Sequence, residues 1–280
     1  MSEYKVLLMD KREGETSFSS LFPVKKAYKG QKIGHAGTLD KFASGLMIVL
    51  CGGATRLNPV FSSMGKSYLA TIEFGSETDT LDPEGEVIAT SGLPTEEMID
   101  SVLPTFLGEQ KQVPPQYSAI HVNGKRAYKE IRKGNIIEMP ERDITISSIE
   151  KVSFDGKFLQ IRCHVSKGTY IRSLARDIAD RMGLKAHLSA LRRETIGPYS
   201  IADVGSADSE ELLRRTGLFS DVQLDEEHRF EIDNGRMRYS FIKSDTDREK
   251  RFKFVRFDSE LYAIGEYDEE GKLKFIFRIG

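Results

Sequence analysis

Residues 143–154 (DITISSIEKVSF) and 157–165 (KFLQIRCHV) both alternate apolar with polar side chains. This period of two is typical of β-strands, because successive side chains of a strand point to opposite faces. An Asp-Gly pair at residues 155–156 separates the two runs, and such pairs favour a tight hairpin turn. A β-hairpin is therefore predicted over residues 143–165.

A helix is predicted directly after this hairpin. Apolar side chains recur at helical spacing over residues 171–182, and Gly183 follows where helices commonly end. A second helix is expected to open at Pro94, because two glutamates follow where its first turn would lie. A further strand is predicted at residues 68–74 (YLATIEF), with Tyr68 on the apolar face.

The last part of the chain changes character. Residues 251–257, 260–267 and 272–279 read as three short strands that follow an acidic connection. We expect a large first domain over residues 1–222 and a small β domain over residues 223–280.

The composition excludes several classes of protein. An apolar fraction of 39% and a charged fraction of 30% are those of an ordinary globular protein. Cys51 and Cys163 lie far apart with no CxxC pattern, and the five histidines show no HExxH pattern. Neither a disulfide framework nor a metal site is therefore expected. No signal peptide or membrane span is recognisable, so a cytoplasmic protein is expected.

The net charge of −2 hides strong segregation along the chain. Residues 73–109 carry ten acidic side chains and no Lys or Arg, whereas residues 157–193 carry nine basic and two acidic side chains. Binding of a polyanion depends on such local clusters and not on the sum over the chain. The acidic stretch at residues 79–86 (DTLDPEGE) does not have calcium-loop spacing and is expected to be a solvated turn.

One carboxylate stands out from its surroundings. Residues 34–45 (GHAGTLDKFASG) contain three glycines, small and apolar residues, and Asp40. Glycines allow tight turns and close approach of another molecule. Asp40 is therefore either a solvated turn residue or a group placed for chemistry.

Four stretches together resemble a known family in their order and spacing. They are residues 34–45, residues 65–75 (GKSYLATIEFG), residues 113–134 (VPPQYSAIHVNGKRAYKEIRKG) and residues 165–197 (VSKGTYIRSLARDIADRMGLKAHLSALRRETIG). They resemble the bacterial tRNA pseudouridine-55 synthases of the TruB type. The resemblance implies an α+β fold with a mixed, largely antiparallel sheet flanked by helices. It also implies an RNA-gripping insertion near residues 110–140 and a C-terminal β domain like a shortened PUA domain.

The same resemblance implies an activity without a cofactor. A uridine, expected to be uridine 55 in the T loop of tRNA, would be isomerised to pseudouridine with Asp40 as the nucleophile. Tyr68 would stack on the flipped base, and no protein partner would be needed. The other substrate-binding residues that the resemblance implies are Tyr170, Arg172, His35 and Leu191.

Physical chemistry makes these roles specific. A carboxylate that must be ionised in a dry pocket needs a partner, because loss of solvent raises a carboxyl pKa. Arg172 is the expected partner, since a guanidinium stays charged and its shape matches a carboxylate. Extruding a base costs a few kcal/mol, and stacking on Tyr68 would return about 1–3 kcal/mol. Wider RNA contacts are therefore expected.

Basic side chains supply the candidates for those wider contacts. Phosphate contacts position RNA without reading its sequence, and they weaken as salt rises. The acidic stretches are expected to face away from the RNA. The candidates for the RNA backbone are Lys66, Lys125, Arg126, Lys129, Arg132, Arg192 and Arg193.

Four positions depart from the family pattern, one of them the mild change to Ser44 where threonine is usual. Arg12 and Lys41 stand where proline is usual, and Gly53 stands where glutamate is common. Two alternatives stay open: a guide-RNA-dependent pseudouridine synthase subunit, and a non-catalytic protein that binds or folds RNA. Binding alone has no need of a carboxylate at Asp40, which favours the enzyme.

Overall fold

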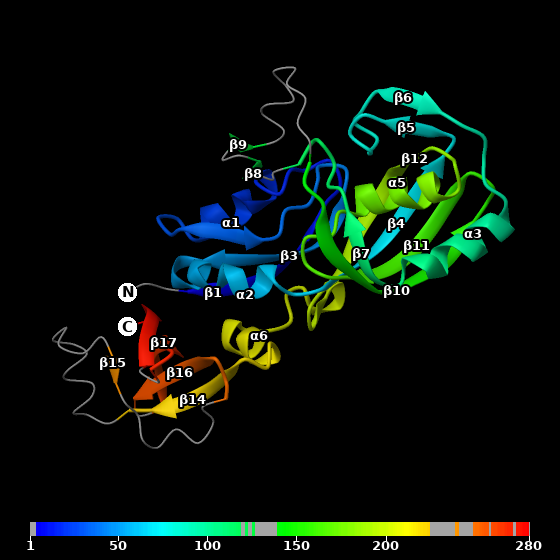
Figure 1. Cartoon of the computed structure of the whole chain (residues 1–280). Helices are drawn as coiled ribbons and strands as arrows, with labels where there is room; N and C mark the ends of the chain where they lie inside the picture. The colour runs from blue at the N-terminus through cyan, green and yellow to red at the C-terminus, as the bar shows by residue number, and fades with distance from the viewer. Residues whose placement is uncertain are drawn as a thin grey trace.

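The computed structural model describes residues 4–118, 121–122, 125–126, 139–224, 239–240, 249–257, 259–270 and 273–279. In this part of the chain, nine strands form one large sheet with the order β1-β3-β12-β4-β11-β10-β7, while β2 pairs with β3 and β13 with β12 (Figure 1). The strands are β1 (Lys5–Lys11), β2 (Ile33–Ala36), β3 (Ser44–Cys51), β4 (Lys66–Phe74), β7 (Gly108–Gln112), β10 (Arg142–Phe154), β11 (Phe158–Val165), β12 (Ala186–Ile196) and β13 (Tyr199–Ser200). Among its described pairs only β3 with β12 is parallel. The predicted mixed, largely antiparallel α+β sheet is confirmed.

The hairpin predicted from the alternating runs is present. β10 and β11 pair antiparallel, and Gly156 in the turn between them has φ +96°, a conformation that glycine adopts without strain. Two small two-stranded sheets accompany the large one. They are β5 (Ser76–Thr78) with β6 (Val87–Thr90), and β8 (His121–Val122) with β9 (Lys125–Arg126).

The helices are short and begin where the sequence allows them. α5 occupies the predicted span and ends just before Gly183, whose φ is +71°. α3 begins at Glu96 and not at Pro94, because the Thr95 hydroxyl accepts a hydrogen bond from Met98 N (3.3 Å) as the N-cap. The helices are α1 (Phe22–Ala27), α2 (Asn58–Ser62), α3 (Glu96–Val102), α5 (Ile171–Arg181) and α6 (Ser209–Arg215), with short 3₁₀ turns at η1 (Ser19–Leu21), η2 (Gly52–Leu57), η3 (Leu103–Phe106) and η4 (Ile201–Asp203). None of the helices in the described residues is long and apolar enough to be a membrane span.

Both faces of the large sheet are covered, and β3 shows this most clearly. Its residues Met47 and Val49 join a core that includes the apolar face of α5, while Leu46 and Ile48 join a second core with α6. All four are fully buried. Alternation along a strand therefore directs successive side chains into two separate cores.

A second sheet forms the C-terminal unit, with the order β14-β16-β17-β18-β15. Its strands are β14 (Phe219–Gln223), β15 (Tyr239–Ser240), β16 (Phe252–Phe257), β17 (Glu260–Tyr267) and β18 (Leu273–Arg278), and β16 to β18 match the three predicted strands. The boundary predicted between residues 222 and 223 falls inside β14, so we propose Phe219 as the start of this unit.

The C-terminal sheet packs against the first unit at η2. A Cβ atom on Gly53 would lie 2.5 Å from the ring of Phe277, and the rings of Tyr4 and Phe277 lie 5.4 Å apart. The departure from the family pattern at Gly53 is thus explained by packing, because any side chain there would push Phe277 away.

Candidate active site

Asp40 lies on the loop between β2 and β3, and hydrogen bonds to the main chain fix this loop. The Ser17 hydroxyl donates to Leu39 O and accepts from Leu39 N, each at 2.9 Å. Gly37 has φ +88°, and Gly45 has φ +111° with Arg193 backbone atoms so close that a Cβ would collide with them at 2.3 Å. The glycines seen in the sequence are therefore required by turn geometry and by close strand packing.

Lys11 also holds this loop, from a position that is 1% exposed. Its ammonium donates to Ala43 O at 2.5 Å, to Glu15 O at 2.6 Å and more weakly to Lys41 O at 3.4 Å. One buried cation thus joins the end of β1 to the main chain directly after Asp40. These bonds constrain the loop although the usual prolines are absent.

Tyr68 and Leu191 come from adjacent strands. Tyr68 sits in β4, where it is 7% exposed, and its register partner on β12 is Arg193. Leu191 lies two residues away on β12. The strand period places both side chains on the face that lines the cavity described below, together with Asp40.

Tyr170 is the N-cap residue of α5, and a buried glutamine holds its backbone. Gln112 Nε2 donates to Tyr170 O at 3.1 Å, and Gln112 Oε1 accepts from Tyr170 N at 2.8 Å. Gln112 is 1% exposed, so water does not compete for these bonds. The two bonds fix the strand-to-helix turn from which both Tyr170 and Arg172 extend.

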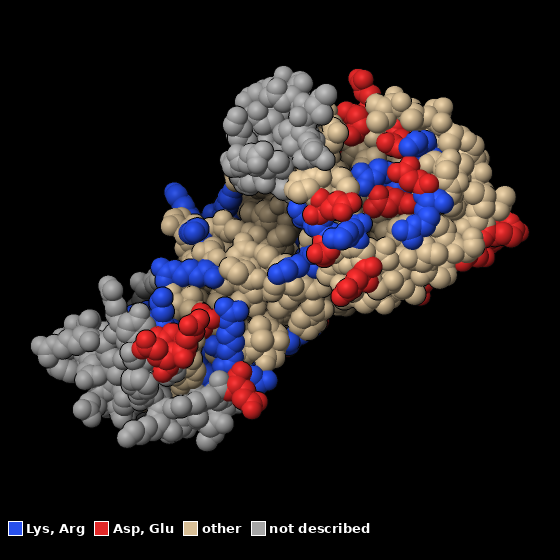
Figure 2. All heavy atoms as spheres, viewed as in Figure 1, with Lys and Arg blue, Asp and Glu red and all other residues tan. Residues whose placement is uncertain are grey.

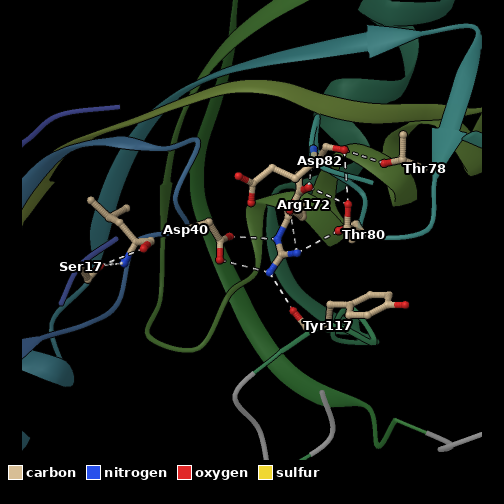
Figure 3. Close-up of polar contacts among 9 residues, drawn as sticks. Ser17, Asp40, Thr78, Thr80, Asp82, Tyr117 and Arg172 are labelled. Carbon is tan, nitrogen blue, oxygen red and sulfur yellow. Dashed lines mark hydrogen bonds and ion pairs between the residues drawn. The ribbon is translucent and has the colours of Figure 1, made fainter. Parts of the chain in front are cut away.

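The guanidinium of Arg172 lies between two carboxylates (Figure 3). Its Nε is 3.0 Å from Asp40 Oδ2, and its Nη1 is 3.0 Å from Asp82 Oδ2. Nη1 also donates to Thr80 O (2.9 Å), and Nη2 donates to Tyr117 O (3.1 Å). The expected pairing of Asp40 with Arg172 is present, and Arg172 is itself fixed by a second acid and two carbonyl groups.

Asp82 was not foreseen from the sequence. The turn at residues 79–86 was expected to be solvated, but Asp82 is 5% exposed, so that expectation is wrong for this residue. Its Oδ1 accepts from the Thr80 hydroxyl (2.6 Å) and from Glu84 N (3.0 Å), while Oδ2 faces Arg172. A buried carboxylate is tolerated here because every oxygen has a donor.

Burial and charge act in opposite directions on the Asp40 carboxyl group. Burial in the cavity raises its pKa, Arg172 lowers it, and the nearby acids Asp82 and Glu84 raise it, with a net increase above the ordinary value. Arg172 is therefore the main group that keeps Asp40 ionised. Burial also raises the pKa of Tyr170, so its phenol is neutral at neutral pH.

These groups line one cavity of about 340 Å³. Its walls include residues 37–40 of the Asp40 loop, Lys66 and Tyr68 of β4, residues 168–172 at the start of α5, and Leu191 and Arg193 of β12. Cavities of this size fall in the range of small-ligand sites. An anion, two phenols and an apolar side chain facing one such space suit a planar base with its ribose.

Comparison with known proteins agrees with this geometry. Residues 25–171 match the TruB family of pseudouridylate synthases, in its N-terminal domain. The chain belongs to the TruB family. A protein of Borreliella burgdorferi named "tRNA pseudouridine synthase B" is 44% identical over 200 residues, which cover 70% of this chain and 71% of the relative. A protein of Treponema denticola with the same name is 42% identical over 218 residues, covering 71% of this chain and 61% of the relative. The family resemblance inferred from the sequence is confirmed.

A solved structure supports the fold along the whole chain. The crystal structure of a Cbf5-Nop10-Gar1 complex contains a chain that superposes with a TM-score of 0.63, covering 98% of this chain and 85% of that one. The sequence identity is 23%, so this likeness concerns the fold alone.

The basic residues expected at the RNA backbone of this TruB-family chain lie in different places. Arg193 is 1% exposed, and its guanidinium donates to Leu46 O (2.7 Å) and Gly37 O (3.1 Å). It therefore supports the Asp40 loop and also lines the cavity, and its contact with the RNA backbone stays a prediction. Arg192 points the other way and pairs with Asp10 (2.7 Å) at the surface.

Lys66 lies at the cavity, where it is 8% exposed and donates to Met64 O at 2.7 Å. Burial lowers its pKa to about 8. His35 is partly buried in β2 and is not among the residues that line the cavity. Lys125 and Arg126 form β9, whose side chains lie outside the described residues, as do Lys129 and Arg132 entirely.

The acidic stretches were expected to face away from the RNA, and two of their members do not. Asp82 forms an ion pair with Arg172, which lines the cavity. Glu84 forms an ion pair with Lys41, the residue after Asp40, at 3.4 Å. The expectation is therefore wrong for this turn. Lys41 stands where the family pattern has proline, and its ammonium group forms an ion pair with Glu84 of the acidic turn.

Proposed function

We propose that this chain isomerises uridine 55 in the T loop of tRNA to pseudouridine, with Asp40 as the nucleophile. The observation that carries the proposal is the Asp40–Arg172 ion pair inside a cavity that also contains Tyr68 and Tyr170. Uridine isomerisation in tRNA follows from family membership and from the printed name of the relatives. The position in the T loop and the role of each side chain are our inference. We also propose a cytoplasmic location, where the tRNA would be met.

The reaction exchanges one glycosidic bond for another. The Asp40 carboxylate attacks ribose C1′, and the bond from C1′ to uracil N1 breaks with its electron pair staying on the uracil. After the base rotates, C5 bonds to C1′ and the carboxylate leaves. The proton on C5 is then lost and N1 takes up a proton, so the product is an isomer of the substrate. Covalent catalysis of this kind divides one difficult step into two easier ones.

The aromatic residues hold the base during this exchange. Tyr68 presents a buried ring at the cavity, which suits stacking on the extruded uracil. Tyr170 faces the same space as a neutral phenol, so it acts as a hydrogen-bond donor or orders a water and not as a phenolate. Leu191 closes the cavity with apolar surface.

The purified protein alone tests this proposal. An unmodified tRNA transcript carrying tritium at uridine C5 is incubated with wild type, with Asp40→Asn and with Asp79→Asn, a matched change in the acidic turn. We expect tritium release from a T-loop uridine by wild type and Asp79→Asn only, while Asp40→Asn still binds the RNA. Release by Asp40→Asn would refute the nucleophile. Absence of release from all three would favour a guide-RNA-dependent subunit or a non-catalytic RNA-binding protein.

A further inference from the structure

Two phenylalanines next to the Asp40 loop are exposed to solvent. Phe18 is 65% exposed and Phe22 is 59% exposed, and their ring centroids lie 6.1 Å apart at 78°. Leu21, which lies between them in sequence, is instead buried in the core. The fold thus uses Leu21 for packing and leaves both aromatic rings at the surface. Adjacent exposed aromatic rings are typical of an interaction surface.

One lysine contacts this aromatic pair, and three more follow it in the sequence. The Nζ atom of Lys25 is 3.4 Å from the centroid of Phe18 and 5.6 Å from that of Phe22. Lys26, Lys29 and Lys32 follow, and residues 16–39 contain no Asp or Glu. Within the described residues, no carboxylate oxygen lies within 4.0 Å of the ammonium group of any of these four lysines.

The basic side chains around α5 are different. Arg176 pairs with Asp177 (2.7 Å), and Lys185 pairs with Asp180 (3.0 Å). Figure 2 shows red and blue atoms side by side over α5, whereas blue atoms without red neighbours lie over α1 at the left of the hollow. Positive charge near α1 is therefore available to an external anion.

The position of this surface relative to the cavity is fixed. Ser17, next to Phe18, bonds to Leu39, next to Asp40, and Gly14 N donates to Lys41 O at 2.9 Å. Val24 and Tyr28 of the α1 region pack on the core to which α5 also contributes. α1 and α5 thus cover the same face of the sheet, α1 beside β3 and α5 beside β12 and β4 (Figure 1).

We propose that Phe18, Phe22 and Lys25 form a stacking platform for an unpaired nucleotide of the substrate RNA, outside the cavity that takes the target uridine. This inference rests on the proposed function, because it needs RNA at the cavity. Stacking on an aromatic ring contributes about 1–3 kcal/mol per base and tolerates any base. The platform therefore adds affinity without adding sequence preference. Because these lysines have no acidic partners among the described residues, the surface suits a polyanion such as a nucleic acid better than a protein surface that carries charges of both signs.

The test uses the double variant Phe18→Ser/Phe22→Ser in the full chain, with Phe158→Ser as the matched control. Phe158 is also exposed and has Lys157 near its ring (5.2 Å), but it starts β11 opposite Glu73, at the other end of β4 from Lys66. We expect the double variant to bind an unmodified T stem-loop about tenfold more weakly. Its single-turnover rate at saturating RNA should stay unchanged, and Phe158→Ser should match wild type.

A second arm identifies the nucleotide. Abasic substitutions are placed in turn at the unpaired loop positions other than the target, and their effects on affinity are measured with wild type and double variant. An abasic site at one loop position should weaken RNA binding by wild type. The same site should cause no further loss of affinity in the double variant, as a coupled pair requires. Lys25→Gln should make the slope of log affinity against log salt concentration less steep, by less than about one, the change expected for one full phosphate contact.

Equal RNA affinity of wild type and the double variant would overturn the platform while leaving the proposed function intact, provided wild type releases tritium. A change confined to self-association, measured by sedimentation, would instead identify a protein interface and also overturn it. If wild type releases no tritium and the double variant nevertheless binds RNA more weakly than wild type, the activity is rejected and the platform is retained.

Discussion

The Asp40 loop and the first turn of α5 face each other across the cavity, but different forces hold them. Hydrogen bonds to main-chain groups fix the loop, through Ser17, Lys11 and Arg193. An ionic chain fixes the other side, where Arg172 joins Asp40 to Asp82. The loop wall sets where the carboxylate lies, whereas the α5 wall sets whether it is charged. Changes at Arg172 should therefore alter pH dependence more than changes at Lys11, which lowers the Asp40 pKa less.

The largest effect is expected from Arg172→Gln. Removing this cation leaves Asp40, a partly exposed side chain in the cavity, without its main counter-charge, so turnover should fall by about a thousandfold, with a much smaller loss of RNA affinity. Arg176→Gln, one turn further along α5 and outside the cavity, should have little effect. Single-turnover rates and filter binding on both variants check this. Equal losses in rate and affinity for Arg172→Gln would contradict it.

The next largest effect is expected from Asp82→Asn. Arg172 loses one of its two acidic partners, so stability should fall by about 2 kcal/mol, and turnover should fall with it. Burial is the main cause of the raised Asp40 pKa, but Asp82 raises it further. Its removal should move the acid limb of the activity profile to lower pH, opposite to the effect of removing Arg172.

Denaturant unfolding and pH–rate profiles measure both effects of Asp82→Asn. Asp79→Asn is the control, because Asp79 Oδ1 accepts a bond from Glu86 N that an amide oxygen can also accept (3.0 Å). An acid limb that moves to higher pH in Asp82→Asn would contradict the proposed ionic chain.

Gln112→Leu tests whether the turn before α5 depends on neutral bonds as well. Both bonds to the Tyr170 backbone are lost, which should cost about 2 kcal/mol of stability and about tenfold in kcat through misplacement of Tyr170 and Arg172. KM should change less, and the acid limb should move to higher pH, because a displaced Arg172 lowers the Asp40 pKa less. Gln110→Leu, whose amide bonds only weakly to Thr105 O (3.3 Å), is the matched control. A loss in KM alone would argue against positioning.

The smallest effect is expected from Lys41→Ala. The Lys41–Glu84 pair crosses between the two walls, but both side chains are about half exposed. Exposed pairs contribute less than about 1 kcal/mol, so rate and stability should stay close to wild type. A double-mutant cycle with Glu84→Ala measures the coupling. A coupling well above that range would mean that this pair, and not Lys11, replaces the missing prolines.

Sequence patterns located the strands, α5 and most of the cavity for clear physical reasons. Alternation placed Tyr68 on the buried face of β4, and the need for a counter-charge indicated Arg172 for Asp40. The burial of Asp82 could not be predicted, because a run of acidic residues resembles a solvated turn and its partner Arg172 lies 90 residues away in the sequence. Gln112 escaped because one buried amide leaves no pattern.

Arg193 shows how strand geometry separates two neighbouring basic side chains. It is adjacent to Arg192 in a strand, so the two side chains must point to opposite faces. Arg193 is the one that points inward, where it lines the cavity, whereas Arg192 lies at the surface.

A carbon-13 NMR titration of the Asp40 carboxyl group tests the central claim most directly. The signal is identified by its loss in Asp40→Asn and is followed against pH in wild type and Arg172→Gln. Wild-type Asp40 should titrate above the ordinary aspartate value of 3.8, because burial outweighs the arginine. In Arg172→Gln the pKa should rise further, since the compensating charge is gone. The same pKa in both proteins would contradict the claim that Arg172 keeps Asp40 ionised.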